Sequence, residues 1–594
     1  MCGICGIASP GRSPDPARLA AMSELLAHRG PDSSGEHIDG PVALGARRLS
    51  ILDLAHGDQP IGNEDESCVV IQNGEIYNYP ELRRELEARG HSFRTRCDTE
   101  AIVHLSEEHG VGFAERLRGM FATAIWDGRR RRLVLARDRY GIKPLYYHHE
   151  DGVLEFASEL RSLPRGEIDL DALEAFLAFN SIPGPSSIFR EVRKLPPGHR
   201  LVWEEEGELR LERYARPGPL AEVELRAGDE AELAEELRAR LRDSVRAHLL
   251  SDVPVGILLS GGVDSAVLAA LAAQETAETV HTFTIGFAER SFDERADARR
   301  VAERYATHHH ELLVRPEPEL LLHALAEAFD EPFADSSALP TYLVSQLAAV
   351  AGPLIEHLPA STRKASLDYK AKRFVRAAHL PPLERHHGWK EIFSADARAE
   401  LTGRRSDFDP VDVYRDRYRE TAGAPELARL QDVDFGVYLV DDLLVKTDRA
   451  SMAHSLEARV PFLDPAVTNL AFALPTRHKV RGLAKKVLLR RAVEPLVPRE
   501  VVHGRKRGFS IPAAAWLRGE LEPFARRTLS AETLGRQGFF RPDAVARILD
   551  EHVAGREDRS RQLWGLLAFT LWYERHVEQE PPRLRSARME ALLT

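Results

Sequence analysis

The chain has 594 residues, of which 43% are hydrophobic and 29% charged, and it carries a net charge of −11. At roughly 150 residues per domain, this length predicts about two to four domains of ordinary globular composition. The acidic balance disfavours a nucleic-acid partner held by phosphate contacts, and no apolar run approaches the roughly 18 residues expected of a membrane-spanning helix. The four cysteines and the lack of a signal-peptide pattern predict a cytoplasmic protein.

The first two hundred residues are predicted to form short strands interrupted by a few amphipathic helices. Gly, Asn and Asp separate the strands, and the helices carry apolar residues at three- and four-residue spacing. The predicted strands cover residues 41–46, 68–72, 120–127, 132–136 and 145–148, and the predicted helices cover residues 16–27, 80–89 and 99–109. Such a mixture indicates a layered domain built on sheets.

A change of composition marks the end of this region. An acidic run at residues 204–206 precedes a Pro- and Gly-containing stretch at residues 216–219, and a charged helix is predicted at residues 230–249. We therefore expect a first domain at residues 1–205, a linker at residues 206–229 and a second domain at residues 230–594.

The second domain begins with alternating strands and helices. Strands are predicted at residues 255–259, 279–287 and 311–314, with helices at residues 265–275 and 292–305. This alternation predicts a parallel α/β sheet with crossover helices. From residue 396 to the end the pattern is almost wholly helical.

Cys2 is a candidate nucleophile because it follows the initiator Met directly. Removal of that Met would place a thiol and a free α-amino group on one residue, and an amine with a pKa near 8 can act as the base for its own thiol. A thiolate that attacks an amide also needs donors for the developing oxyanion. Asn73 offers a side-chain amide and Gly74 a backbone N–H, directly after an apolar strand.

Short segments of the first domain resemble the class II glutamine amidotransferase family. In chain order they are CGICG at 2–6, HRGPD at 28–32, RLSI at 48–51, NGEIYN at 73–78, CDTE at 97–100, ARDR at 136–139 and GIKPL at 141–145. The resemblance implies an N-terminal-nucleophile fold, an αββα sandwich that hydrolyses glutamine to glutamate and ammonia.

The same resemblance assigns roles to individual residues. Cys2 would be the nucleophile, and Asn73 with Gly74 would form the oxyanion hole, with Asn73 also contacting glutamine. Arg48 would pair with the α-carboxylate of glutamine, while Glu75 and Asp98 would hold its α-ammonium. This distribution suits a zwitterionic amino acid, which needs one cation and one or two carboxylates. Cys5 is interpreted as a small buried thiol beside the active strand.

A Gly-rich turn at residues 260–265 forms the second candidate site. Ser260, Gly261 and Gly262 follow an apolar strand, and Asp264 and Ser265 open a helix. Glycines allow backbone N–H groups to approach a phosphate closely, and a helix N-terminus favours negative charge. The Gly-Lys-Ser/Thr ending of a Walker A motif is missing. The string SGGVDS resembles the pyrophosphate loop of the ATP pyrophosphatases, and Asp264 is a candidate Mg²⁺ ligand.

Together the two domains resemble the glutamine-hydrolysing asparagine synthetase family over nearly the whole chain. Further matching segments are HTFTIGF at 281–287, DEP at 330–332, DSS at 335–337, DDLLVKTD at 441–448, SLEARVPFLD at 455–464, KKVLLR at 485–490 and KRGF at 506–509. The resemblance implies that ATP–Mg²⁺ activates aspartate as an acyl-adenylate, which ammonia then attacks. It implies no tightly bound organic cofactor, and it suggests a homodimer.

By the same resemblance, Leu258, Leu259 and Ile285 would line the adenine pocket. Lys486 would steady phosphate charge as the adenylate forms, a role suited to a flexible cation. Lys485 beside it is the alternative for this role.

The second domain departs from the family in one respect. Relatives carry a strand followed by Ser-Gly-(Asp/Glu)-Gly-x-Asp-Glu, which supplies adenosine contacts, a catalytic acid and a second Mg²⁺ carboxylate. No such motif occurs in this chain, and residues 347–362 read as the site of an internal deletion. Loss of a metal carboxylate should cost several kcal/mol of transition-state stabilisation. Glu356 and Asp368 are candidate replacement acids, without a spacing argument for either.

Three explanations of this departure remain open: a degenerate synthetase, a synthetase that uses other carboxylates, and a faulty gene model. The leading function is glutamine-dependent synthesis of asparagine. The alternatives are a glutaminase with a defective synthetase domain, an amidotransferase for another carboxylate, and a non-catalytic partner-binding remnant. The run His308-His309-His310 is interpreted as structural, because no further ligand lies at metal-binding spacing in the sequence.

Overall fold

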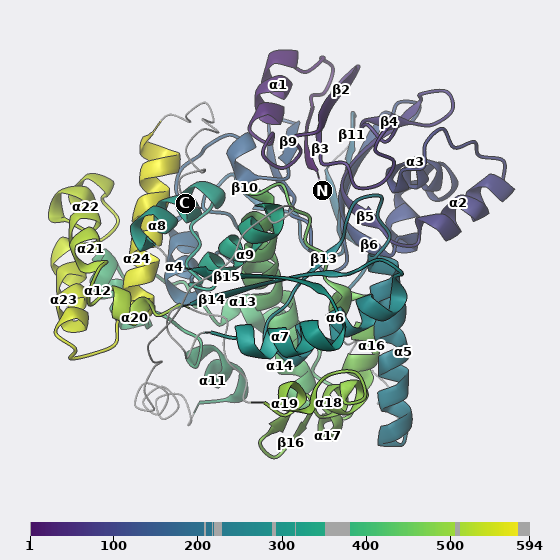
Figure 1. Cartoon of the computed structure of the whole chain (residues 1–594). Coiled ribbons are helices and arrows are strands. Elements are labelled where there is room, and N and C mark those ends of the chain that lie inside the picture. The colour runs from purple at the N-terminus through teal and green to yellow at the C-terminus, as the bar shows by residue number, and fades with distance from the viewer. Residues whose placement is uncertain are drawn as a thin grey trace.

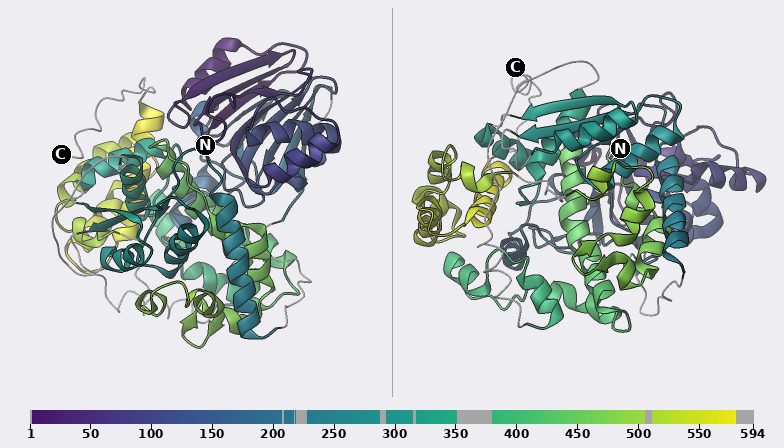
Figure 2. Two further views of the ribbon diagram at one scale, coloured as in Figure 1. Left: turned by 45° about the vertical axis from the view of Figure 1, so that its right-hand side comes forward. Right: turned by 60° about the horizontal axis from the view of Figure 1, so that its bottom comes forward.

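We describe the protein from a computed structural model, which covers residues 2–206, 209–216, 218, 228–287, 293–314, 317–350, 380–504 and 511–579. Within these ranges, no helix is both long and apolar enough to cross a membrane. The N-terminal part (purple and blue) packs against a larger part (teal to yellow), and the N-terminus lies where the two meet (Figures 1 and 2).

Two six-stranded antiparallel sheets form the N-terminal part. The first sheet, in spatial order, consists of β10 (Val192–Lys194), β8 (Tyr146–Glu150), β9 (Val153–Ala157), β1 (Gly3–Ala8), β3 (Val42–Arg48) and β2 (Ser33–Asp39). The second consists of β12 (Arg210–Arg213), β11 (His199–Glu204), β7 (Arg132–Arg137), β6 (Gly119–Asp127), β5 (Cys68–Ile76) and β4 (Ile61–Gly62). The register sets Asn73 opposite Ala122 and Gly74 opposite Phe121.

These sheets and their helices make four layers. Apolar side chains from both sheets form one core between them, which includes Ile4, Leu44, Ile71 and Trp126. Helices α1 (Pro16–Glu24) and α4 (Leu170–Phe179) cover the outer face of the first sheet, and α2 (Tyr79–Ala88) and α3 (Asp98–His109) cover that of the second. The predicted αββα sandwich is confirmed, and most predicted elements agree with the observed ones to within a few residues.

The end of this part lies further along the chain than the sequence indicated. The expected linker began at residue 206, yet β12 pairs with β11 and extends the second sheet to Arg213. The charged residues of β12 concealed it, because an exposed edge strand needs little apolar side chain. Residues 219–227 of the expected linker lie outside the described residues.

A parallel three-stranded sheet opens the second part, as predicted. Its order is β13 (Gly256–Leu258), β14 (His281–Phe287) and β15 (His308–Val314). The crossover helices α6 (Val263–Glu275) and α7 (Arg295–Arg304) pack with α5 (Glu230–His248) in one hydrophobic core. Helices α8 (Pro318–Ala328) and α9 (Ala338–Val350) belong to a second hydrophobic core, which also contains α1 and α4. Within the described ranges β13 is an edge strand, and Leu258 on it is 37% exposed.

The remainder is almost wholly helical, as expected, apart from the short hairpin β16 (Val480–Arg481) and β17 (Ala484–Lys485). Its helices are α11 (Pro382–Gly388), α12 (Ala395–Thr402), α13 (Asp412–Glu420), α14 (Glu426–Gly436), α15 (Val445–Met452), α16 (Pro465–Ala473), α17 (Thr476–Lys479), α18 (Val487–Val493), α19 (Arg499–Val502), α20 (Ala513–Trp516), α21 (Glu522–Thr528), α22 (Ala531–Gln537), α23 (Pro542–Val553) and α24 (Ser560–Tyr573). Helix α24 carries Trp564 and Trp572 into the core that also contains α4.

A buried network of charges joins the two parts. The Arg29 guanidinium is fully buried and contacts Glu159 at 2.8 Å and both carboxylate oxygens of Asp448 at 2.8 and 3.0 Å. Arg449 contacts Glu159 at 3.0 Å and Asp330 at 3.1 Å. Because these groups come from both parts, the network fixes the second part beside the start of β1.

Candidate functional site

Cys2 lies at the start of the central strand β1, at the boundary between the two sheets. Its side chain is buried, and its backbone nitrogen donates to Oδ1 of Asn73 on β5 at 3.2 Å. The structure therefore brings together the predicted nucleophile and the predicted oxyanion-hole residue, which are 71 positions apart in the sequence.

The amide of Asn73 has a second feature that bears on chemistry. While its oxygen accepts from Cys2, its Nδ2 is buried and has no hydrogen-bond partner in the structure. Buried donors are rarely left unpaired, so such a group beside a nucleophile is a candidate binding group for an oxyanion.

Gly74 is required by its close approach to the neighbouring strand. A Cβ at this position would lie 2.0 Å from the carbonyl oxygen of Met120 on β6. Any other residue would therefore push β5 and β6 apart beside the Asn73 amide.

Burial raises the pKa of the Cys2 thiol, while the charge of Arg48 and a hydrogen bond from the Leu49 backbone lower it. Gln59 also faces the thiol: its Nε2 lies 3.9 Å from Sγ and 3.4 Å from Oγ1 of Thr99. Sequence reasoning missed Gln59, because it lies in a loop outside the matching segments and only the fold brings it to Cys2.

Arg48, the predicted ligand of the glutamine carboxylate, is buried at the end of β3. It contacts Asp58 at 2.9 Å and donates to the carbonyl oxygens of Leu52 and Asp53 at 2.8 Å. The guanidinium thus holds the loop that follows β3 and also lowers the pKa of the Cys2 thiol.

Glu75 and Asp98, the predicted ligands of the ammonium, are both buried near each other. Burial raises the pKa of Glu75 well above its usual range, and the charges of Glu457 and Asp98 raise it further. Burial also raises the pKa of Asp98, although hydrogen bonds from Ile76 N–H at 2.7 Å and Gln72 Nε2 at 3.1 Å oppose this effect. A pair of buried carboxyl groups with raised pKa values favours the binding of a cation.

The second part contributes directly to this site. Arg459 lies 3.6 Å from Glu75 and 2.5 Å from Glu457, and it donates to the carbonyl oxygens of His248 and Leu250 at 2.7 Å. The segment 455–464 matched the family in sequence, but nothing in the sequence predicted this contact with Glu75.

The predicted pyrophosphate loop connects β13 to α6. Ser265 Oγ lies 2.8 Å from Ser260 Oγ and accepts from the Ser260 N–H at 3.0 Å, while Gly262 N–H donates to Ser260 Oγ at 3.2 Å. At Gly261, a Cβ would lie 3.0 Å from the Cβ of Asp297, so the tight turn leaves little room for a side chain.

Lys486 contacts Asp264 through an ion pair at the start of α6. It adopts a left-handed backbone with φ +56°, which is uncommon for a residue with a side chain, and it directly precedes α18. Lys485, the alternative, lies on β17 with an exposed side chain. The structure therefore brings Lys486 to the loop.

The residues expected to line an adenine pocket lie on the adjacent parallel strands β13 and β14 and at the end of β13. The register sets Leu258 opposite Phe283, so Leu258 and Ile285, two residues further on, share one face of the sheet. Leu259 points to the other face, into the core with α5 and α6. Leu258 is 37% exposed at the sheet edge, and the assignment of these residues to adenine stays a prediction.

A cavity of about 820 Å³ lies away from the loop 260–265, and residues of both parts line it, with Phe179 and Asn180 among those from the N-terminal part. Asp335, Tyr438 and Asp442 are among its lining residues. The buried Lys446 donates to Oδ2 of Asp335 at 2.6 Å, and although burial raises the pKa of Asp335, this ammonium lowers it to about 2. No residue of the loop 260–265 is among those that line the cavity in the described parts of the chain.

Several predictions fall outside the described residues. They concern most of the deletion site at residues 347–362, the replacement acids Glu356 and Asp368, and the matching segment at residues 506–509. These predictions therefore remain untested.

Comparison with known proteins identifies both parts. The family model "Glutamine amidotransferase domain" matches residues 1–215, and the model "Asparagine synthase" matches residues 236–574. A Bacillus subtilis protein named asparagine synthetase [glutamine-hydrolyzing] 1 is 33% identical over 630 aligned positions, which cover 98% of this chain and 97% of the relative. An Arabidopsis thaliana protein named asparagine synthetase [glutamine-hydrolyzing] 2 is 31% identical, covering 91% of this chain and 84% of the relative.

The Bacillus alignment is longer than the 594 residues of this chain, so it contains gaps on this chain's side. Near-complete coverage in both directions and the match of both family models lead to one conclusion: this chain belongs to the glutamine-hydrolysing asparagine synthetase family.

Proposed function

We propose that this protein hydrolyses glutamine at Cys2 and uses the released ammonia, with ATP, to convert aspartate into asparagine. The observation that carries the first half is the geometry at Asn73, whose oxygen accepts a hydrogen bond from the Cys2 nitrogen while its buried Nδ2 has no hydrogen-bond partner among the described residues. Family membership carries the second half.

Removal of the initiator Met would convert the Cys2 nitrogen into a free amine. This amine accepts the thiol proton, and Sγ attacks the side-chain carbonyl carbon of glutamine. Asn73 Nδ2 and the Gly74 N–H stabilise the oxyanion, the proton passes to the leaving nitrogen, and ammonia departs from a thioester that water hydrolyses to glutamate. The hydrogen bond from Cys2 to Asn73 supports this role, because it orients the amide.

Substrate recognition in this scheme depends on charge. Glu75 and Asp98 have raised pKa values because they are buried, so the ammonium of glutamine would restore their ionised forms. Arg48 supplies the positive charge for the α-carboxylate. Its existing contact with the exposed Asp58 would be exchanged for the substrate.

In the synthetase half, ATP enters with its Mg²⁺ as a substrate. A carboxylate oxygen of aspartate attacks the α-phosphorus, pyrophosphate leaves, and ammonia then attacks the acyl carbon and displaces AMP. The hydroxyls of Ser260 and Ser265 and the contact between Lys486 and Asp264 support this assignment. Mg²⁺ bound to phosphates needs only one or two protein carboxylates, so Asp264 fits the role of its protein ligand.

A second candidate is a glutaminase with a defective synthetase half. It is favoured by β13, which carries the loop and yet forms the edge of its sheet within the described ranges. The strand that relatives carry before their second motif has no counterpart in this sequence, and the gaps in the Bacillus alignment agree with a shortened chain. On this reading Lys486 and Asp264 remain as an ion pair without turnover.

Parallel measurements of glutamate and pyrophosphate release distinguish the two. With glutamine, aspartate and Mg–ATP, the first proposal expects both products, and Asp264→Ala should abolish pyrophosphate while keeping glutamate. Cys2→Ala is the matched control, since it should lose glutamate but still form pyrophosphate when ammonium chloride is supplied. Glutamate without pyrophosphate in the wild type would establish the second candidate.

The acceptor is tested by replacing aspartate with other carboxylates in the same assay. Pyrophosphate release that depends on a different carboxylate, and not on aspartate, would overturn the assignment of the acceptor alone. We also infer a cytoplasmic location, which is supported by four cysteines that are all free.

A further inference from the structure

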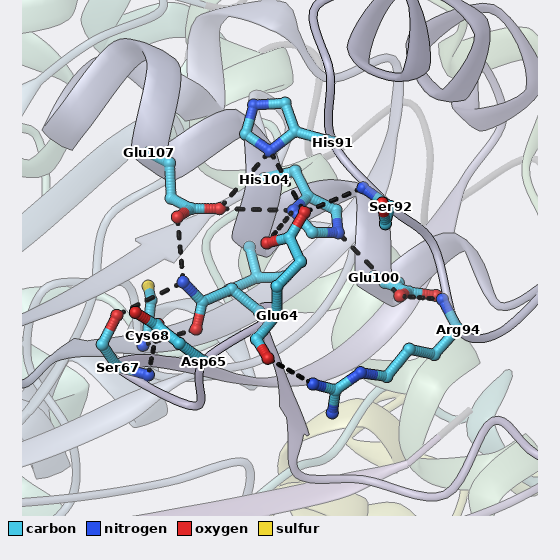
Figure 3. Close-up of polar contacts among 12 residues, drawn as sticks. Glu64, Asp65, Ser67, Cys68, His91, Ser92, Arg94, Glu100, His104 and Glu107 are labelled. Atoms are coloured by element: carbon cyan, nitrogen blue, oxygen red, sulfur yellow. Dashed lines mark hydrogen bonds and ion pairs between the residues drawn. The ribbon is translucent and has the colours of Figure 1, made fainter.

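A cluster of histidine and glutamate side chains lies on the outer side of the second sheet, apart from the glutamine site. Glu64 lies in the turn between β4 and β5, His91 in the connection between α2 and α3, and His104 and Glu107 on α3 (Figure 3). The two helical residues share one face because they are three positions apart. Thus three separate segments converge on one point, which no sequence motif indicated.

The spacing of the four side chains matches a tetrahedral metal site. Nδ1 of His91 lies 3.8 Å from Oε1 of Glu64 and 3.6 Å from Oε2 of Glu107, and Nδ1 of His104 lies 3.6 Å from Oε2 of Glu64 and 3.2 Å from Oε2 of Glu107. Ligands at about 2.0–2.1 Å from a tetrahedral zinc ion lie about 3.4 Å from each other. The one ligand atom that each side chain offers lies within 4.8 Å of all the others.

Three of these side chains are also oriented by a further partner. Glu64 accepts from the Ser92 N–H at 2.8 Å, and Oε1 of Glu107 accepts from Asn63 at 2.9 Å, which leaves Oε2 facing the histidines.

His91 follows the same rule through its far nitrogen, Nε2, which lies 3.1 Å from Glu108. A carboxylate placed behind a histidine in this way orients the imidazole toward a metal and increases its basicity. Nε2 of His104 lies 3.9 Å from Glu100, beyond hydrogen-bond distance, so burial rather than a hydrogen bond holds this side of the ring.

Burial and charge also suit a bound cation. The His104 side chain is fully buried, while those of His91, Glu107 and Glu64 are 13%, 26% and 39% exposed, so the cluster has a rigid base and an open side. Two neutral imidazoles and two carboxylates carry two negative charges, which a divalent ion balances. Nitrogen and oxygen donors in a tetrahedral arrangement favour zinc among divalent metals.

We propose that Glu64, His91, His104 and Glu107 form a structural Zn²⁺ site that ties the β4–β5 turn and the α2–α3 connection to helix α3. All four ligands come from the protein, as is usual for structural zinc sites. Helix α3 begins at Asp98, which accepts hydrogen bonds from β5, so the ion stabilises the helix that carries this wall of the glutamine site.

A second histidine cluster provides an internal comparison. His281 of β14 lies beside His308 and His310 of β15, so the run at 308–310 does gain a further histidine from the neighbouring strand. This group contains no carboxylate, and the nearest nitrogens are 3.2 and 3.3 Å apart in direct pairs. We use it as a matched control.

The test is metal binding by the full chain after removal of metals with EDTA. Zn²⁺ is titrated calorimetrically, and Co²⁺ is used as a spectroscopic probe. We expect the wild type to bind an ion with visible bands of tetrahedral Co²⁺ and no thiolate charge-transfer band. His91→Gln/Glu107→Gln should lose this ion, whereas His308→Gln/His310→Gln should keep it.

Two further measurements separate a metal site from a network of ion pairs. Glu108→Gln, which removes only the carboxylate behind His91, should weaken Zn²⁺ binding about 10- to 100-fold. Saturating Zn²⁺ should raise the Tm of the amidotransferase unfolding transition by roughly 5–10 °C at 100-fold excess over Kd, and not in the double variant. The proposal is overturned if the His91/Glu107 double variant binds Zn²⁺ as tightly as the wild type, or if the wild type binds none.

Discussion

Asp448→Asn should weaken the attachment of the second part to the first. The substitution preserves the shape of the side chain but removes a charge that contacts Arg29 at 2.8 and 3.0 Å. The Arg29 side chain is fully buried, and removing one partner of a buried ion pair costs about 3–5 kcal/mol. Because Glu159 still contacts Arg29 at 2.8 Å, we expect the loss in the free energy of unfolding to lie at the lower end of this range, about 3 kcal/mol.

The effect should depend on pH with a definite sign. Although burial raises the pKa of Asp448, Arg29 lowers it below its ordinary value, and the pKa of Glu159 is lowered well below its usual range, chiefly by Arg449 against the effect of burial. Carboxylates with depressed pKa values stabilise the folded state above the unfolded pKa of about 4, and this contribution is lost as the pH falls through the folded pKa. The difference in the free energy of unfolding between Asp448→Asn and wild type should therefore be fully present at pH 7 and should decrease below about pH 4.

Urea denaturation followed by tryptophan fluorescence measures this difference. Asp416→Asn is the matched control, because Asp416 pairs with Arg419 on the surface with a side chain that is 91% exposed, and it should leave the midpoint unchanged. A second readout is the KM for glutamine, since Arg29 Nε also donates to the Cys2 carbonyl oxygen at 3.2 Å. Equal midpoints for Asp448→Asn and wild type at pH 7 would refute the reasoning.

Three further predictions follow from the site and its surroundings. Asn73→Ala should lower the kcat of glutamine hydrolysis about 10²–10³-fold with little change in KM, while synthesis from ammonium chloride is unaffected; a change confined to KM would contradict the oxyanion role. Gly74→Ala should lower the Tm and the glutaminase rate together, because the new Cβ would lie 2.0 Å from the Met120 carbonyl oxygen, and a variant with wild-type Tm would argue against that contact. Burial lowers the pKa of His248 to about 3, so the unfolded state takes up a proton below about pH 6.5 that the folded state does not. As the pH falls from 6 to 4, wild type should lose about 1.4 kcal/mol per unit relative to His248→Asn, and parallel stability curves would exclude this titration.

The features that can be singled out from the sequence are those with strict local requirements. Cys2, the Asn73-Gly74 pair and the loop 260–265 can be recognised because their chemistry needs particular residues in immediate succession. The αββα layers followed from alternating apolar strands and helices, and the start of the helical C-terminal region followed from its periodicity.

The features that the sequence did not reveal depend on contacts between distant segments. Arg459 reaches Glu75 across 384 positions, and Gln59 reaches Cys2 from a loop without a motif. The cluster around His104 needs three segments that only the folded domain brings together.

Within the described parts of the chain β13 lies at the edge of its sheet, and this has a consequence for handling the protein. An edge strand presents unpaired backbone N–H and C=O groups, with which strands of other molecules can pair and so aggregate. Here the residues that lead into β13 are tethered to the N-terminal part, since Asp252 N–H donates to Ile51 and its carboxylate accepts from Asp53. Pro254 further shortens the stretch that could template a new strand. The synthetase half expressed alone would lose these contacts with the N-terminal part. Insolubility of such a fragment would therefore result from the loss of the N-terminal part and not from an inability of the fragment to fold.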